Sequence, residues 1–252
     1  MRTQVYFIGA GPGDPELITV RGRRLIEEAD VLIWADSLVN PDVMALAKKG
    51  AEIHTSADLS LGEITAIMKE AVRRGKMVAR VHSGEPSIYG AIQEQMAVLD
   101  EAGIDYEVVP GVSSLFAAAA ALKTELTIPE LSQTVIITRL SGRTPVPEAE
   151  KLKGLASHNC SMAIFLSTGL IKKVVKELVE GGYPEDTPSA LVYRASWPEQ
   201  KIVRGSLKDL AEKVKAAGIT RQALILVGRF LEPKGKASQS KLYDKDFKHG
   251  YR

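Results

Sequence analysis

The sequence predicts two α/β domains, and two observations lead to this prediction. Apolar runs typical of strands alternate with helical patterns five times between residues 5 and 122, which is typical of a mostly parallel sheet with helices on both faces. The pattern changes at an alanine-rich helix, residues 115–122, and at a polar stretch, residues 123–133, that is typical of a linker. We therefore expect an N-terminal domain at residues 1–122 and a C-terminal domain at residues 123–252, with a polar tail from residue 232.

Local signals define the elements of the first domain. Thr19 can cap a helix that runs to about residue 29, and Asn40, followed by proline, begins a helix that Gly50 ends. Ser60 and Glu63 form a capping box for a helix that runs to residue 74. We expect strands at residues 5–8, 31–34, 52–54, 77–81 and 106–109, and further helices from residue 91 to about 102 and at 115–122.

The second domain repeats the order of strands and helices. We expect strands at residues 135–138, 162–165, 190–193, 201–204 and 223–227, a short helix ending near 154, and helices at 170–180 and 207–217. The strands at 190–193 and 201–204 are expected to pair antiparallel, since a turn containing Trp197 and Pro198 separates them. The tail carries Leu242, Tyr243 and Phe247, which indicate that it docks on another surface.

The composition argues against several classes of function. The chain has 33 basic and 31 acidic residues, and this net charge of +2 argues against nucleic-acid binding. The longest wholly apolar run, residues 115–122, is far shorter than the roughly 20 residues of a membrane span. Without a signal-peptide pattern we expect a cytoplasmic protein, in which the single Cys160 is an ordinary thiol. We expect no protein-bound metal, since the histidines show no ligand spacing: His54, His82, His158 and His249.

The first loop, residues 9–15, resembles a nucleotide-binding glycine loop but lacks its chemistry. The dinucleotide fingerprint has a third glycine where this chain has Asp14, whose carboxylate would face the pyrophosphate. Pro12 and Pro15 also remove two backbone N–H donors that a phosphate cradle needs. We therefore expect the glycines to serve tight packing or close approach of a ligand.

Four later loops share an unusual composition and a common position. Residues 83–86, 110–114, 166–169 and 195–198 are small, rich in turn formers and mostly uncharged. Each could be a plain connection. Because ligands of α/β sheets gather outside the carboxyl ends of strands, four such loops at matching positions predict a ligand site.

Several separated motifs, read together, resemble a known family. Residues 9–15, 84–90, 110–114 and 227–229 occur with the order and spacing of the tetrapyrrole methylases, S-adenosylmethionine-dependent enzymes that methylate uroporphyrinogen and the precorrins. The resemblance covers nearly the whole chain. It implies a class III methyltransferase-like fold with two α/β domains, an interdomain cleft and a homodimer. Residues 193–199 and 240–252 are similar to the branch that methylates C-11 of precorrin-4 or cobalt-precorrin-4 in cobalamin (vitamin B12) biosynthesis.

The resemblance also implies site residues. S-adenosylmethionine needs close backbone approach and an apolar slot, which small loop residues permit, and S-adenosylhomocysteine would be its product. The implied cofactor contacts are Pro12, Ser83, Gly84, Glu85, Ile88, Ser113, Ser114, Leu166 and Ala195. The first loop would face the tetrapyrrole through Gly11, Gly13 and Asp14. At Glu85 the family commonly has aspartate, so the reach of this carboxylate differs.

Catalysis by such an enzyme consists chiefly of aligning the nucleophilic carbon with the methyl group and excluding water. Asp36 matches an aspartate assigned as proton acceptor in the uroporphyrinogen-methylating relatives, but it can equally cap the turn before Asn40. The lysine that those relatives use as its partner is not evident in residues 54–57. Arg139 and Arg143 are candidates for binding substrate carboxylates, or are solvated loop residues.

The sequence leaves three alternatives open. A nicotinamide-dependent oxidoreductase of Rossmann type would use Asp36 for the ribose hydroxyls, although the first loop argues against it. A regulatory module would bind the tetrapyrrole or the cofactor without turnover. A sister methylase would act at another ring carbon of a precorrin. The presence of cobalt in the substrate is also open.

Overall fold

The computed structural model describes residues 4–232, and the chain divides into two compact units. Unit 1 consists of Met1–Ala117 with Arg194–Pro198, and unit 2 of Ala118–Tyr193 with Glu199–Arg252. The expected boundary after residue 122 is close to this division, which falls inside the helix α5 (Ser114–Leu122). The assignment of Arg194–Pro198 to unit 1 was not expected from the sequence.

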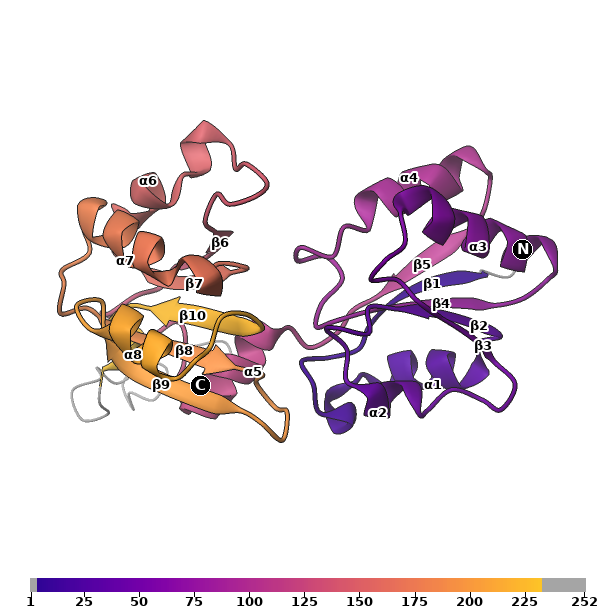
Figure 1. The fold of residues 1–252 in the computed structure, drawn as a ribbon, viewed down its shortest axis with the longest axis horizontal. Coiled ribbons are helices and arrows are strands. Elements are labelled where there is room, and N and C mark those ends of the chain that lie inside the picture. The colour runs from indigo at the N-terminus through magenta and orange to yellow at the C-terminus, as the bar shows by residue number, and fades with distance from the viewer. Residues whose placement is uncertain (1–3, 233–252) are drawn as a thin grey trace, which may run out of the picture. The chain divides into compact units, whose positions relative to one another are not determined.

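Unit 1 is a parallel sheet of five strands between two layers of helices (Figure 1). The strand order is β3-β2-β4-β1-β5 and every pairing is parallel, which confirms the predicted architecture. The strands are β1 (Val5–Gly9), β2 (Val31–Trp34), β3 (Glu52–Thr55), β4 (Val78–His82) and β5 (Tyr106–Val109). The helices are the 3₁₀ turn η1 (Pro15–Leu17), α1 (Val20–Glu28), α2 (Pro41–Met44), α3 (Leu61–Arg73) and α4 (Gln93–Glu101).

The core of unit 1 has two halves, one on each face of the sheet. Alternate residues of a strand point to opposite faces. Tyr6 and Ile8 therefore pack with α1 and α2, whereas Val5 and Phe7 pack with α3 and α4. With both faces covered, β1 and β2 are continuously apolar, which is why the sequence predicts them clearly.

The predicted caps are present in unit 1. The Thr19 hydroxyl accepts a hydrogen bond from the N–H of Gly22 at 3.1 Å, and Ser60 and Glu63 form the capping box. Asn40 caps α2, but this helix ends at Met44 and not at Gly50. The predicted end is wrong because the chain continues beyond Met44 in turns closed by hydrogen bonds between residues three apart.

Unit 2 contains a mixed sheet of order β6-β7-β10-β8-β9 (Figure 1). Its strands are β6 (Val135–Arg139), β7 (Ser161–Phe165), β8 (Pro188–Tyr193), β9 (Lys201–Ser206) and β10 (Ala223–Val227). β6 is parallel to β7, β10 is antiparallel to both β7 and β8, and β8 and β9 form the predicted antiparallel pair. Thus β6, β7 and β8 run in the same direction, and their carboxyl ends lie at one edge of the sheet.

Three helices pack on one face of this sheet around an apolar core. They are α6 (Leu152–Ala156), α7 (Ile171–Glu180) and α8 (Leu210–Ala216), with the 3₁₀ turns η2 (Glu148–Glu150), η3 (Thr168–Leu170) and η4 (Arg229–Leu231). The predicted start of α8 at residue 207 is wrong. The Asp209 carboxylate accepts a hydrogen bond from the N–H of Ser206 at 2.8 Å, and this closes a turn before the helix begins.

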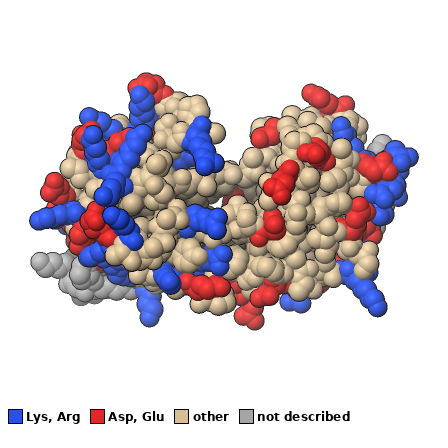
Figure 2. All heavy atoms as spheres, in the orientation of Figure 1, with Lys and Arg blue, Asp and Glu red and all other residues tan. Residues whose placement is uncertain are grey.

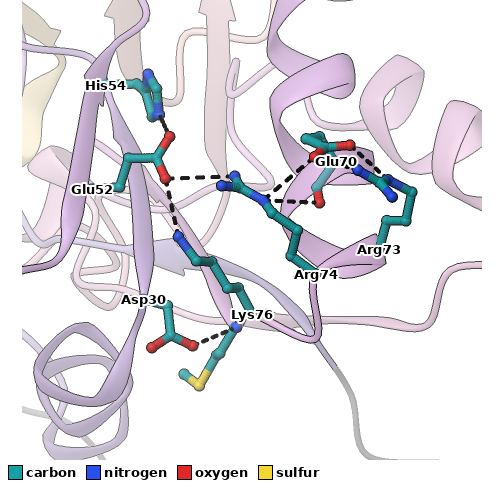
Figure 3. Close-up of polar contacts among 8 residues, drawn as sticks. Asp30, Glu52, His54, Glu70, Arg73, Arg74 and Lys76 are labelled. Carbon is teal, nitrogen blue, oxygen red and sulfur yellow. Dashed lines mark hydrogen bonds and ion pairs between the residues drawn. The ribbon is translucent and has the colours of Figure 1, made fainter.

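A network of charged side chains lies at the amino ends of β2, β3 and β4 (Figure 3). The Glu52 carboxylate contacts His54 Nε2 at 2.9 Å and Lys76 Nζ at 3.2 Å, and Asp30 accepts a hydrogen bond from the N–H of Met77 at 2.8 Å. The hydrogen bonds from His54 and then Lys76 hold the pKa of Glu52 below its ordinary value. These groups are partly exposed, so they contribute modestly to stability. The predicted ligand loop at residues 83–86 follows the opposite, carboxyl end of β4.

Two expectations concern the chain as a whole. No helix among residues 4–232 combines the length and the apolar character needed to cross a membrane. The predicted docking residues of the tail, Leu242, Tyr243 and Phe247, lie outside the described residues.

Candidate active site

Three glycines bring the ends of β4, β1 and β5 into backbone contact. A Cβ atom added at Gly9 would lie 2.6 Å from both the Cα of Gly111 and the carbonyl oxygen of Gly84. A Cβ atom at Gly111 would lie 2.2 Å from the same oxygen of Gly84. Because real Cβ atoms do not approach so closely, a side chain at either position would push the loops apart. These glycines therefore allow close packing between loops, which is one of the two roles expected for the glycines of the first loop.

Glu85 fastens two of these loops together. Its carboxylate accepts hydrogen bonds from the backbone N–H of Gly111 at 2.8 Å and from that of Ser87 at 2.9 Å. Burial acts to raise the pKa of Glu85, but the bonds from Ser87 and Gly111 outweigh it and hold the pKa below its ordinary value. The carboxylate is thus charged and engaged within the protein.

The segment Arg194–Pro198 covers the first loop within unit 1. The indole Nε1 of Trp197 donates a hydrogen bond to the carbonyl oxygen of Pro12 at 2.8 Å. A Cβ atom at Gly13 would lie 2.0 Å from the Trp197 ring, so this glycine is required by close approach of the indole. The guanidinium of Arg194 stacks over the same indole ring, with its central carbon 4.7 Å from the ring centroid.

The remaining polar groups of the first loop also have partners in the protein. Asn40 donates from its amide nitrogen to the carbonyl oxygen of Gly13 at 2.9 Å. The N–H of Asp14 donates to the Ser196 hydroxyl at 3.0 Å, and the Asp14 carboxylate accepts from the N–H of Glu16 at 2.9 Å. The predicted contacts Pro12, Gly13 and Asp14 therefore lie together with Gly11, but four of their polar groups already bond within the protein and hold the loop in shape.

The loop that follows β5 leads into α5. The Ser113 hydroxyl accepts a hydrogen bond from the N–H of Leu115 at 3.3 Å, and Ser114 begins the helix. Ser113 is buried, whereas Ser83, Ile88 and Ser114 are half-buried. The structure thus brings these predicted cofactor contacts to one edge of the unit 1 sheet, together with Gly84 and Glu85.

Strained backbone is concentrated in the loops that the sequence singled out. Among residues 4–232, nine residues other than glycine have positive φ, and five of them lie in or beside these loops: Tyr89 (φ 55°), Ala91 (50°), Leu166 (52°), Arg194 (45°) and Ser196 (68°). Such conformations cost of order 1 kcal/mol or more each and persist where the surroundings enforce them. They are enriched at binding sites, which supports a functional role for these loops.

Asp36 lies in the exposed turn that follows β2. The backbone N–H groups of Leu38 and Val39 donate to the carbonyl oxygen of Ala35, and Asn40 supplies the cap of α2. Asp36 thus lies in the turn that precedes the cap of α2. Its carboxylate faces solvent at the carboxyl end of a strand next to β4.

The other predicted site residues belong to unit 2, except for the buried Ala195 of unit 1. Leu166 follows β7, has a positive φ and is 72% exposed. Both the conformation and the exposure are uncommon for a leucine. Arg139 donates to the carbonyl oxygens of Thr144 at 3.0 Å and Pro145 at 2.7 Å, so its guanidinium shapes its own loop. Arg143 lies exposed in that loop. Within residues 4–232 no group of three or more His, Cys, Asp or Glu side chains could hold a metal ion.

Comparison with protein families shows which family the chain belongs to. The model of the Tetrapyrrole (Corrin/Porphyrin) Methylases matches residues 4–211. The chain belongs to this family. This tetrapyrrole methylase is therefore a methyltransferase, and the predicted fold and reaction class are confirmed.

Individual relatives are similar over almost their entire length. A cobalt-precorrin-4 C(11)-methyltransferase of Methanocaldococcus jannaschii is 62% identical over 99% of this chain and 96% of the relative. A precorrin-4 C(11)-methyltransferase of Pseudomonas aeruginosa is 50% identical over 98% of both chains.

Solved structures agree with this family. The crystal structure of a cobalt precorrin-4 methyltransferase, a cobalamin biosynthetic enzyme, is 55% identical, with a TM-score of 0.89 over 91% of this chain and 96% of that chain. A uroporphyrin-III C-methyltransferase of Thermus thermophilus, complexed with S-adenosyl homocysteine, is 29% identical, with a TM-score of 0.77 over 91% and 93% of the two chains.

Two features of this edge were not predicted from the sequence. The clamp formed by Trp197 on Pro12 and Gly13 joins residues about 185 positions apart, and no local pattern indicates such a contact. The engagement of Glu85 by Gly111 likewise depends on the sheet order. A signal was present only in Gly13, because a glycine beside two prolines indicates that something approaches the backbone closely.

Proposed function

We propose that the protein transfers the methyl group of S-adenosylmethionine to C-11 of precorrin-4 or cobalt-precorrin-4 in cobalamin biosynthesis. The observation that carries the proposal is the 62% identity, over 99% of the chain, to a relative named for this reaction. The 50% identical relative is named for precorrin-4 without cobalt, so the proposal includes both forms of the substrate.

The loops at the ends of β1, β4 and β5 fit the cofactor that the family uses. Their glycines bring three stretches of backbone together, and the charged Glu85 carboxylate already accepts hydrogen bonds from Ser87 and Gly111. Bound there, S-adenosylmethionine would supply a methyl group on a sulfonium leaving group. We propose that residues 83–85, Ile88 and residues 113–114 hold it and that Leu166 and Ala195 add apolar contacts. The complex of the Thermus thermophilus relative with S-adenosyl homocysteine supports this choice of cofactor.

The chain needs little acid and base chemistry for this reaction. C-11 of the conjugated macrocycle acts as an enamine-like carbon nucleophile, so the loops chiefly align it with the methyl group and exclude water. Asp36 is the candidate acceptor for a proton that the ring loses, because its carboxylate is exposed at the end of β2 and does not cap α2. Its replacement by asparagine should lower kcat more than it raises either KM.

The charges of unit 2 support binding of a substrate that carries several carboxylates. Unit 1 has 12 basic and 17 acidic residues, whereas unit 2 has 21 basic and 14 acidic residues, and Figure 2 shows lysine and arginine side chains gathered over unit 2. Arg143 is the better candidate for a carboxylate contact, since the guanidinium of Arg139 is bonded to loop carbonyls. Replacing both should raise the KM for the tetrapyrrole far more than it weakens cofactor binding.

Incubation with methyl-labelled S-adenosylmethionine and precorrin-4, with and without cobalt, tests the proposal. Mass spectrometry and carbon NMR should locate one new methyl group at C-11. A methyl group at another ring carbon would instead identify a sister enzyme. Tight binding of both ligands without transfer would indicate a regulatory module, and calorimetric binding of NADH in place of S-adenosylmethionine would indicate an oxidoreductase.

We further propose that the protein is a cytoplasmic homodimer, as the resemblance implies. Light scattering of the purified protein should give twice the chain mass of 27.3 kDa. A mass of one chain would contradict the dimer.

A further inference from the structure

Arg80 is a buried cation whose hydrogen-bond acceptors in the described part of the chain are all neutral. It lies on β4, the central strand of unit 1, and only 6% of its surface is exposed. Its guanidinium donates to the Gln95 amide oxygen at 3.1 Å, the Ser56 hydroxyl at 3.1 Å and the carbonyl oxygen of Ile33 at 3.3 Å. Among the described residues no carboxylate pairs with it, so three neutral acceptors satisfy a full charge.

Such an arrangement is costly for the fold. A buried charge without a counter-ion is destabilising unless its surroundings compensate for the lost hydration. Burial lowers the pKa of Arg80 to about 10, and burial together with the Arg80 charge lowers that of the neighbouring His82 to about 3. An apolar residue would fill this position at lower cost, so stability alone does not account for the arginine.

The first arm of Arg80 leads to the end of β2. Ser56, one of its acceptors, donates its hydroxyl to the carbonyl oxygen of Trp34 at 3.0 Å, and the carbonyl of Ile33 accepts directly from Arg80. Trp34 is the last residue of β2, and Asp36 follows two positions later. The guanidinium therefore braces the backbone from which Asp36 projects.

The second arm leads to the loop that follows β4. Gln95, whose amide oxygen accepts from Arg80, donates its amide nitrogen to the carbonyl oxygen of Ala91 at 2.8 Å. Ala91 and Tyr89 both have positive φ, so this turn is strained and needs to be held. The same loop carries Glu85 and Ile88, two of the proposed cofactor contacts.

We infer that Arg80 is a positioning residue for methyl transfer, which acts through Gln95 on the cofactor loop and through Ser56 on the strand end that carries Asp36. The inference rests on the proposed function, because it assigns the two arms to the two sides of that reaction. The Gln95 arm governs affinity for S-adenosylmethionine. The Ser56 arm governs the rate of the chemical step.

Gln95→Glu tests the Gln95 arm, because it moves stability and binding in opposite directions. The new carboxylate gives Arg80 a counter-ion, so the melting temperature should stay equal or rise. It cannot donate to Ala91, so the Kd for S-adenosylmethionine by calorimetry should rise about tenfold, as expected for one lost hydrogen bond. Unchanged affinity, or a fall in affinity that accompanies a fall in melting temperature, would overturn the inference for this arm.

Ser56→Ala tests the Ser56 arm and serves also if Gln95→Glu does not fold. It should lower kcat several-fold with the Kd for S-adenosylmethionine unchanged, and an unchanged kcat, or an equal change of both, would overturn the assignment. The matched control is Thr65→Val, which should leave all constants unchanged. The buried Thr65 hydroxyl donates to the carbonyl oxygens of Leu61 and Gly62 within its own helix, α3. If the wild-type protein fails to methylate precorrin-4, the proposed function fails, whereas the binding comparison of Gln95→Glu with wild type still tests the Gln95 arm.

Discussion

The two sheets each bring several strand ends to one edge, but they build those ends differently. In unit 1 the ends of β1, β4 and β5 meet through Gly9, Gly84 and Gly111, and no side chain separates them. In unit 2 the end of β7 turns through Leu166, which keeps an exposed side chain in a left-handed conformation. Glycine makes a close contact possible without strain, whereas leucine accepts strain to present an apolar group. The edge in unit 1 is therefore formed by closely packed backbone, whereas the edge in unit 2 presents the Leu166 side chain.

The largest effect should come from a side chain at the glycine contact. In Gly111→Ala the new Cβ would meet the Gly84 carbonyl oxygen at 2.2 Å, so the loops must separate. We expect a loss of about 3 kcal/mol in the free energy of unfolding, measured by urea denaturation, and loss of cofactor binding. The control Gly154→Ala, in α6 with nothing within 4 Å of the added Cβ, should be stabilised by up to about 1 kcal/mol. Equal stability of the two variants would contradict the backbone contact.

The second largest effect should be a fall in stability at acid pH, caused by the buried His82 at the end of β4. Burial and the Arg80 charge lower the pKa of His82 from 6.5 to about 3. The unfolded chain therefore binds a proton below about pH 6.5 that the folded chain does not, so stability falls as the pH falls from about 6.5 towards 3, by about 2 kcal/mol at pH 5.

A pair of histidine variants checks the origin of this slope. His82→Gln should flatten the fall in the free energy of unfolding between about pH 6.5 and 5. His158→Gln, at an exposed position, should keep the slope of the wild type. A wild-type slope in His82→Gln would show that other groups cause the acid sensitivity.

The clamp on the first loop should contribute less. Trp197→Phe removes the donor to the Pro12 carbonyl oxygen and should cost about 1 kcal/mol, with a higher KM for the tetrapyrrole. Trp34→Phe is the matched control, because the Trp34 Nε1 is buried without a hydrogen-bond partner among the described residues. If both variants lower the melting temperature equally, the Trp197 hydrogen bond does not hold the loop.

The smallest effect on stability, with a clear effect on binding, should come from Leu166. Asparagine tolerates the left-handed conformation, so Leu166→Asn should leave the melting temperature nearly unchanged. It removes an apolar contact, so the Kd for S-adenosylmethionine should rise about tenfold. Leu61→Asn, at another exposed leucine, should leave this Kd unchanged. An unaltered Kd in Leu166→Asn would exclude Leu166 from the cofactor site.

Much of unit 1 was predictable because its signals are local. The caps at Thr19, Asn40 and Ser60, and apolar strands buried on both faces, can be read from a few adjacent residues. The rejection of a phosphate cradle was predictable too, since it followed from Asp14 and two prolines. The family resemblance then supplied the reaction class.

The unpredicted features depend on contacts between distant parts of the chain. The antiparallel position of β10 between β7 and β8 follows from pairing across about 60 residues, which periodicity does not reveal. The hydrogen bonds from Gly111 to Glu85 and from Trp197 to Pro12 likewise join distant parts of the chain. The cation at Arg80 was missed because an arginine within an apolar strand is expected to lie at the surface.

A crystal structure with bound S-adenosylhomocysteine tests the central claim most directly. That claim is that the loops joined by Gly9, Gly84 and Gly111 form the floor of the cofactor site. The ligand should lie within hydrogen-bond distance of the backbone of residues 83–85 and contact residues 113–114. A ligand bound away from both segments, or with its amino-acid group on the backbone of residues 9–14 in the manner of a pyrophosphate, would contradict the account.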